Sequence, residues 1–172
     1  QAKPAQTPDI QAILAGNAAV NQRDFAKAVE SYTDAIRLNA KNPTAYLNRG
    51  VVYRLQGKTT EALKDFASVL SIEPKNEGAY MQMALTHTQM KQPDEAFKDY
   101  GKVLELDPQA LAAYMNRGLL YRAVGQPEKA IADFSKLIEL KSDAAGAYIA
   151  RGLTYEMMQK YEEAVTDYTQ AI

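Results

Sequence analysis

The chain repeats itself with a period of 34 residues, and this repetition limits its possible folds more than any other feature. The pattern AYLNRGVVY begins at Ala45, returns as AYMNRGLLY at Ala113, two periods later, and returns as AYIARGLTY at Ala147. No insertion or deletion disturbs the spacing after residue 8. A unit of this length cannot bury its apolar face alone, so the period predicts units that stack in series.

The copies share a small number of constrained columns. They span residues 9–42, 43–76, 77–110, 111–144 and 145–172, and the last copy is shortened. One column of small residues holds Gly16, Gly50, Ala84, Gly118 and Gly152. A second small column holds Ala28, Ala62, Ala96, Ala130 and Ala164. An aromatic column holds Tyr32, Phe66, Tyr100, Phe134 and Tyr168. We expect the small columns to lie where the helices of one copy come closest together, with the aromatic side chains filling the space beside them.

The spacing within each copy predicts two helices joined by a short turn. In the second copy, apolar residues recur at helical spacing over residues 44–56 and over residues 59–72, and Gly57 lies between the two stretches. Asn42 followed by Pro43 is typical of a helix start, because the asparagine caps free N–H groups and the proline suits the first helical position.

These columns resemble the tetratricopeptide repeat (TPR) family over the whole chain after residue 8. The resemblance implies an all-α fold, a right-handed superhelical solenoid of five helix-turn-helix hairpins over residues 9–172. Two features depart from the family pattern. Ala12 replaces a large residue of the first helix, and the closing proline, present as Pro74 and Pro108, is absent from the first and fourth copies. We therefore expect looser packing in the end repeats.

The composition argues against several classes of function. The 20 Lys+Arg and 21 Asp+Glu leave a net charge of −1 without any block of like charge, whereas nucleic acids and anionic membranes attract clustered basic surfaces. The absence of cysteine excludes disulfides, thiolate catalysis and cysteine-based zinc sites. The single histidine, His87, occupies an aromatic column, so we expect a half-buried substitute for tyrosine rather than a metal ligand or base. No apolar run is long enough to cross a bilayer, and we expect no metal or cofactor.

Of the 11 tyrosines, all but Tyr161 lie in aromatic columns, which indicates packing roles rather than chemistry.

Two further columns predict ion pairs. Every copy with an arginine in the column of Arg49 also has an aspartate sixteen residues later. We predict three pairs within copies, which are Arg49 with Asp65, Arg117 with Asp133, and Arg151 with Asp167. The alternative is that these arginines are simply solvated.

The resemblance also implies where a partner binds. In the TPR family the first helix of each repeat lines the inner wall of the superhelix, and here the columns on that wall hold amides, apolar residues and two cations. A side-chain amide both donates and accepts hydrogen bonds, so a row of amides can hold the backbone of an extended peptide. The predicted peptide-binding residues are Asn48, Gln82, Asn116, Val51, Leu85, Leu119, Arg54 and Arg122. The alternative is that asparagine is merely tolerated on an exposed helix face.

We therefore expect a non-enzymatic scaffold that binds a peptide or a partner helix. The sequence has no Gly-rich phosphate loop, no pair of histidines and no GxSxG nucleophile motif. Two alternatives stay open: the targeting segment of a longer enzyme, and an assembly protein. The second alternative predicts an apolar patch around Tyr161, Ala164 and Tyr168, where the last, uncapped repeat would form a homo-oligomer.

The first eight residues are short, polar and rich in proline, so we expect residues 1–8 to be a disordered N-terminal segment. A start at Gln1 is what removal of a signal peptide leaves, and excision from a longer chain leaves the same kind of start. Together with the lack of cysteine, it favours an exported or periplasmic protein slightly over a cytoplasmic one.

Overall fold

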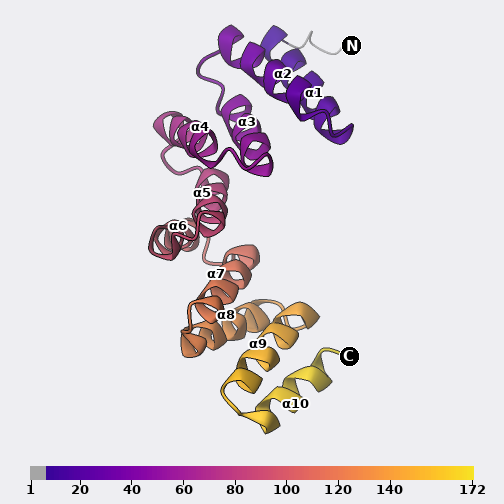
Figure 1. Cartoon of the computed structure of the whole chain (residues 1–172), viewed down its shortest axis with the longest axis vertical. Helices are drawn as coiled ribbons and strands as arrows, with labels where there is room; N and C mark the ends of the chain where they lie inside the picture. Colours follow the sequence, from indigo (N-terminus) through magenta and orange to yellow (C-terminus); the bar gives the residue numbers. More distant parts are fainter. Residues whose placement is uncertain (1–6) are drawn as a thin grey trace. The chain divides into compact units, whose positions relative to one another are not determined.

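The computed structural model describes residues 7–172, and this part of the chain forms ten helices and no strand (Figure 1). The helices are α1 Pro8–Asn21, α2 Phe25–Leu38, α3 Pro43–Leu55, α4 Thr59–Ile72, α5 Glu77–Gln89, α6 Pro93–Leu106, α7 Leu111–Ala123, α8 Pro127–Leu140, α9 Ala145–Met157 and α10 Tyr161–Gln170. Each predicted copy holds two of them, so the prediction of an all-α chain of helix pairs is confirmed.

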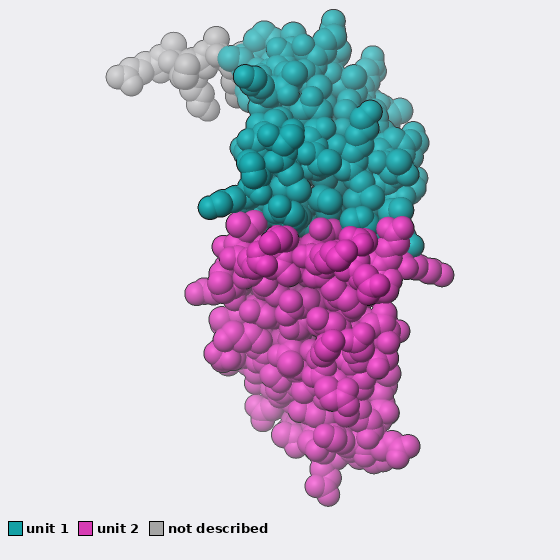
Figure 2. Space-filling view, turned by 90° about the vertical axis from the view of Figure 1, so that its left-hand side faces the viewer, with its two compact units in different colours: residues 1–90 teal, residues 91–172 magenta. Residues whose placement is uncertain are grey.

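The chain divides into two compact units, residues 1–90 and residues 91–172, and the boundary falls between α5 and α6 (Figure 2). In the first unit, α1 packs on α2, α3 packs on α4, and α3 also contacts α2 and α5. In the second unit, α7 packs on α8 and α9 packs on α10, while α8 and α9 join the two pairs. The same succession of contacts thus links neighbouring hairpins within each unit.

The predicted helix ends are accurate to one residue in the second copy. Helix α3 begins at Pro43, and the Oδ1 atom of Asn42 accepts a hydrogen bond of 3.1 Å from the backbone N–H of Thr44. Gly57 ends the turn after α3 with φ of 75°, a left-handed conformation that favours glycine. Pro93 and Pro127 likewise stand at the start of second helices, where the missing N–H costs no hydrogen bond.

The left-handed turn residue recurs in every repeat, although glycine does not. Gly57 and Gly125 have φ of 75° and 73°. The equivalent residues Arg23, Lys91 and Gln159 have φ of 59°, 56° and 60°. A residue with a Cβ atom is strained in this region by about 1–2 kcal/mol, so the surrounding helix pair imposes the turn on three side chains that do not favour it.

The small glycine column is explained by the aromatic column of the same repeat. A Cβ atom added at Gly16 or Gly50 would lie 2.5 Å from the ring of Tyr32 or Phe66, respectively. Such an atom at Gly118 or at Gly152 would lie 2.7 Å from the rings of Phe134 and Tyr168. The expectation that these glycines mark a close approach is therefore correct, but the space is taken by an aromatic ring of the second helix rather than by the alanine column.

The alanine and aromatic columns form the core of each unit. Ala28, Ala62, Ala96 and Ala130 are fully buried, and so are the rings of Phe66 and Phe134. Among the tyrosines, Tyr32 and Tyr100 are buried, whereas Tyr46, Tyr80, Tyr114, Tyr148, Tyr53, Tyr121, Tyr155 and Tyr168 are half-buried. His87 is half-buried as well, as its place in a tyrosine column predicts.

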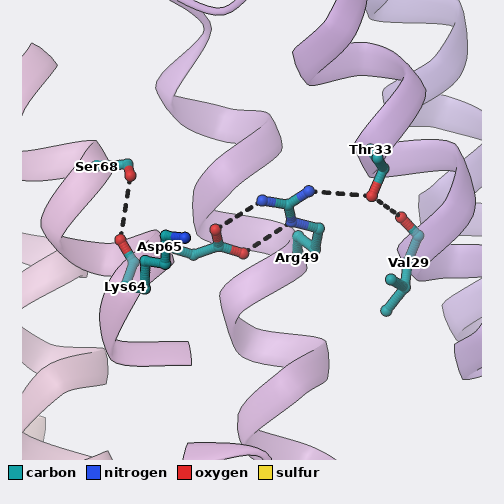
Figure 3. Close-up of polar contacts among 6 residues, drawn as sticks. All are labelled: Val29, Thr33, Arg49, Lys64, Asp65 and Ser68. Carbon is teal, nitrogen blue, oxygen red and sulfur yellow. Dashed lines mark hydrogen bonds and ion pairs between the residues drawn. The ribbon is translucent and has the colours of Figure 1, made fainter. Parts of the chain in front are cut away.

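All three predicted ion pairs are present and have the same geometry. Arg49 donates from Nε and Nη2 to the two carboxylate oxygens of Asp65, with both distances at 2.8 Å (Figure 3). Arg117 makes the same two bonds to Asp133, and Arg151 makes them to Asp167, at 2.7 and 2.8 Å. Two parallel bonds of this kind fix the orientation of both side chains.

The Arg49 guanidinium has further partners besides Asp65. Its Cζ atom lies 5.9 and 5.8 Å from the ring centres of Tyr46 and Tyr53, and its Nη1 atom donates to the hydroxyl of Thr33 on the preceding hairpin. The hydrogen bonds to Asp65 raise the pKa of Arg49, in opposition to burial, which lowers it. Arg151 reaches the hydroxyl of Ser135 in the same way, so these arginines link successive hairpins.

Helix α1 starts inside the segment that we expected to be disordered. Residues 1–6 lie outside the described residues, but Pro8 is the first residue of α1, where its fixed φ suits the helix. The buried carboxylate of Asp9 accepts hydrogen bonds from the side-chain amides of Asn39 and Asn42, at 3.0 and 2.9 Å. Hydrogen bonds from the side chains of Thr7, Asn42 and Asn39 hold the pKa of Asp9 well below its ordinary value.

The contact between glycine and ring predicts opposite effects for two glycine-to-alanine substitutions in the second unit. Gly118→Ala places a Cβ atom 2.7 Å from Phe134 and should destabilise the protein by about 1–3 kcal/mol through overpacking. Gly101→Ala, also within a helix, meets nothing within 4 Å and should stabilise by about 0.5–1 kcal/mol. Urea unfolding measures both, and equal shifts in the same direction would contradict the steric explanation.

The bidentate pair predicts strong coupling between Arg117 and Asp133. Their side chains are 21% and 7% exposed, so removal of either partner leaves a largely desolvated charge without its counterpart. In a cycle of Arg117→Ala, Asp133→Ala and the double variant, the coupling energy from urea unfolding should be about 1–3 kcal/mol. If the two substitutions change the free energy of unfolding additively, the coupling energy is zero and the ion pair does not contribute to stability.

Candidate functional site

The predicted peptide-binding residues lie on the first helices of three successive repeats. Asn48, Val51 and Arg54 belong to α3, and Gln82 and Leu85 belong to α5, so these five residues lie in the first unit. Asn116, Leu119 and Arg122 belong to α7 in the second unit. All eight side chains are half-buried, as expected for residues that are neither in the core nor fully solvated.

Asn48 is joined to a second asparagine that was not among the predicted site residues. The Nδ2 atom of Asn48 donates to Oδ1 of Asn17 on α1 at 3.1 Å, and the hydroxyl of Tyr32 donates to the same oxygen at 2.7 Å. Burial raises the pKa of Tyr32, which keeps this hydroxyl a donor. Asn17 occupies the column of Val51, and this amide in an otherwise apolar column is the signal by which the sequence reveals it.

The predicted cation of the second repeat is bonded to the predicted amide of the third repeat. Nε of Arg54 on α3 donates to Oε1 of Gln82 on α5 at 3.1 Å, and the contact is partly buried. The carbonyl oxygen of Gln82 therefore already has a donor, and Arg54 retains its two terminal nitrogens for another acceptor. The sequence did not predict this bond between the two residues.

In the second unit the two polar predicted residues bond backbone oxygens, Asn116 within its own helix α7 and Arg122 on helix α9. Nδ2 of Asn116 donates to the backbone oxygen of Ala112 one turn earlier at 2.9 Å, and Nη1 of Arg122 donates to the backbone oxygen of Ala150 at 3.3 Å. Leu119 packs against the core residues Ala130, Phe134 and Ala150. Among the described residues, Asn116 has no amide partner, so a continuous chain of bonded amides does not extend through this unit.

A hollow of about 250 Å³ lies beside the Asn17–Asn48 pair, between α1, α2 and α3. Its lining consists of Asn17, Val20, Asn21, Tyr32, Asn48, Val51, Val52 and Leu55. Two predicted site residues, Asn48 and Val51, thus border a concave surface that is mostly apolar and carries amides. No lining residue is charged.

The apolar patch predicted at the last repeat is present in a different form. Tyr161 is 62% exposed, but Ala164 is buried, because it belongs to the alanine column between the helices of its hairpin. Tyr168 is half-buried, and its hydroxyl donates to a carboxylate oxygen of Glu156 at 2.9 Å. The exposed apolar neighbours of Tyr161 in sequence are instead Met157 and Val165, at 61% and 62%. The prediction was therefore right for Tyr161 and wrong for Ala164.

Other kinds of site find no support in the described residues. Over residues 7–172, no group of three or more histidine, aspartate or glutamate side chains is arranged to hold a metal ion. Within the same range, no helix combines the length and hydropathy that crossing a membrane requires.

Comparison with known proteins finds one kind of repeat along the chain. Models of the tetratricopeptide repeat match residues 13–77, 78–110, 111–143 and 145–172. No curated protein matches the sequence. A crystal structure of the MamA protein is similar with a TM-score of 0.83 and 23% identity, covering 95% of this chain and 89% of that one.

Two further structures are similar over nearly the whole chain. A tetratricopeptide repeat protein from Parabacteroides merdae has a TM-score of 0.83 and 29% identity, covering 95% of this chain and 65% of that one. YrrB, described as a TPR protein with an unusual peptide-binding site, has a TM-score of 0.74 and 22% identity, covering 98% of this chain and 92% of that one. At these identities, the MamA and YrrB structures establish a shared fold.

Proposed function

This chain belongs to the tetratricopeptide repeat family of protein-interaction scaffolds, and we propose that it holds an extended segment of a partner protein on the first helices of its repeats. Scaffolds of this family are generally non-enzymatic.

The observation that carries the proposal is the pair of linked amides beside the hollow. Oδ1 of Asn17 accepts two hydrogen bonds, but its Nδ2 atom makes none among the described residues, and neither does Oδ1 of Asn48. The pair therefore offers one free donor and one free acceptor at fixed positions. A peptide backbone presents the complementary groups, and its N–H and C=O can bind both amides regardless of sequence.

The neighbouring residues add attraction without demanding a sequence. Val51 and Leu85 supply apolar surface in the first unit, and Leu119 supplies it in the second. Arg54 and Arg122 each use one nitrogen within the chain and keep others for a carboxylate of the partner. The peptide-binding site named for YrrB, which shares the fold, also supports a peptide as the bound species.

A second candidate function is self-association through α10. In the column of Val165, the equivalent residues Val29, Leu63, Phe97 and Ile131 are half-buried. Within the second unit, the ring of Phe97 on α6 stacks on Tyr121 of the following first helix, with ring centres 4.2 Å apart. Val165, at 62% exposure, thus lies on the face that other repeats use for stacking. We propose that a second copy of the chain covers this face.

The amide proposal predicts a loss of affinity for a selected peptide. A peptide that binds the wild type is obtained from a random peptide library and titrated calorimetrically into Asn48→Ala, Gln82→Ala and Asn116→Ala. Asn48→Ala should weaken binding about three- to tenfold, the value of one or two hydrogen bonds. Gln109→Ala, at an exposed amide outside the inner columns, is the control. Unchanged affinity in all three amide variants would refute this role for the amides.

Self-association predicts a concentration-dependent mass that a single charge abolishes. Light scattering of the wild type should show dimers or larger species at high concentration, and Val165→Lys should be monomeric, because burial of an unpaired ammonium is costly. Val124→Lys, at a valine 38% exposed on another surface, should behave as the wild type. A wild type that stays monomeric at its highest soluble concentration would exclude this function.

A further inference from the structure

The hollow in the first unit lies where the first repeat has valine in a column that holds arginine in the second and fourth repeats. Val20 on α1 occupies a column that continues as Arg54, Thr88, Arg122 and Glu156. Each of these arginines bonds a residue of the following first helix, 28 positions further along the chain. Arg54 donates to the side chain of Gln82, and Arg122 donates to the backbone oxygen of Ala150. Gln82 and Ala150 are the equivalents of Asn48. Valine cannot make this bond, so the space beside Asn48 stays open.

The apolar part of the lining is aliphatic, and the polar part consists of amides and one tyrosine. Val20, Val51, Val52 and Leu55 form an aliphatic surface, and no charged side chain contributes to the lining. Leu55 is 54% exposed, which leaves a large apolar side chain uncovered at the edge of the hollow. Because burial of a charge without a partner is strongly unfavourable, this lining selects an uncharged, apolar occupant.

The size of the hollow corresponds to one side chain. A cavity of about 150 Å³ holds a benzene molecule, whereas pockets for drug-sized ligands begin at about 300 Å³. The hollow measures about 250 Å³, which is room for one large aliphatic or aromatic side chain.

The polar atoms of the hollow are suited to a backbone. The amides of Asn17 and Asn48 keep a free donor and a free acceptor, and the exposed side chain of Asn21 makes no hydrogen bond among the described residues. An inserted side chain brings its own backbone N–H and C=O groups with it. These groups require partners as the side chain leaves water, and the three amides can supply them.

We propose that this hollow is an anchor site that receives one leucine- or phenylalanine-sized side chain of the bound partner segment, while Asn17, Asn21 and Asn48 bind the backbone on either side of it. The inference rests on the proposed function and adds a sequence requirement to it. The amides alone bind any extended segment, whereas the anchor site selects segments with a large apolar residue at one position.

The test uses four capped peptides, acetyl-Ser-Gly-X-Gly-Ser-amide with X as leucine, phenylalanine, alanine or lysine, titrated into the whole chain. NMR spectra of the methyl groups of Val20, Val51 and Leu55 and of the side-chain amides of Asn17 and Asn48 report binding. We expect shifts at both sets with leucine and phenylalanine, and at least about tenfold weaker binding with alanine and lysine.

Two variants locate the effect in the hollow. Val20→Arg introduces the side chain that fills the equivalent space at Arg54 and Arg122, and it should abolish the preference for leucine and phenylalanine over alanine. Leu55→Ala removes one wall and should weaken leucine-peptide binding, whereas Leu38→Ala, at a leucine of similar exposure (52%) outside the hollow, should leave it unchanged. Circular dichroism monitors folding, and Leu55→Ala decides if Val20→Arg does not fold.

The outcomes separate the anchor site from the proposed function. Equal binding of all four peptides, with shifts at the asparagine amides, would overturn the anchor site and leave the amide contact standing. Shifts at neither set with any peptide would overturn both. A preference for leucine and phenylalanine that persists in Val20→Arg and in Leu55→Ala would place the anchor elsewhere and overturn the site proposed for it.

Discussion

The contact between a glycine of the first helix and an aromatic ring of the second is the constraint on which each hairpin depends. In four repeats the ring lies so close that even a methyl group at the glycine would collide with it. The ring therefore sets how closely the two helices pack, and the buried alanine column can do so only within that limit. Gly50 and Phe66 therefore depend on each other, since a larger residue at position 50 or a different ring at position 66 would change the contact between the two helices.

Hairpins that are internally fixed still need a specified register relative to one another, and the half-buried Arg49 and Arg151 each contribute a bond to the preceding hairpin. Arg49 satisfies its own aspartate and also reaches the hydroxyl of Thr33 on the preceding hairpin. A bidentate bond and a third donor fix a rigid group in three directions, which is more a matter of specificity than of net stability. Arg117 is preceded by Gly101 in the hydroxyl column, so this additional bond is not available at that repeat.

The sequence predicted the helices and the three ion pairs, because both follow from spacing. It did not predict the bond between Arg54 and Gln82 or the turn of Asn116 toward Ala112, because spacing places a Cα atom on a face but does not select a rotamer. Asn17 was missed as a partner of Asn48 for a related reason. Asn17 is the one polar residue in a column that otherwise holds Val51, Leu85, Leu119 and Leu153, and spacing gives this single exception no role.

A left-handed residue closes the turn between the two helices of every repeat. Arg23, Lys91 and Gln159 keep this conformation without the residue type that tolerates it best, so the bend is dictated by the helices on either side. Each of these positions stores local strain that a glycine would relieve. These three turns, which lie between helices, are therefore positions at which a glycine would regain stability without altering any helix or any residue of the candidate site.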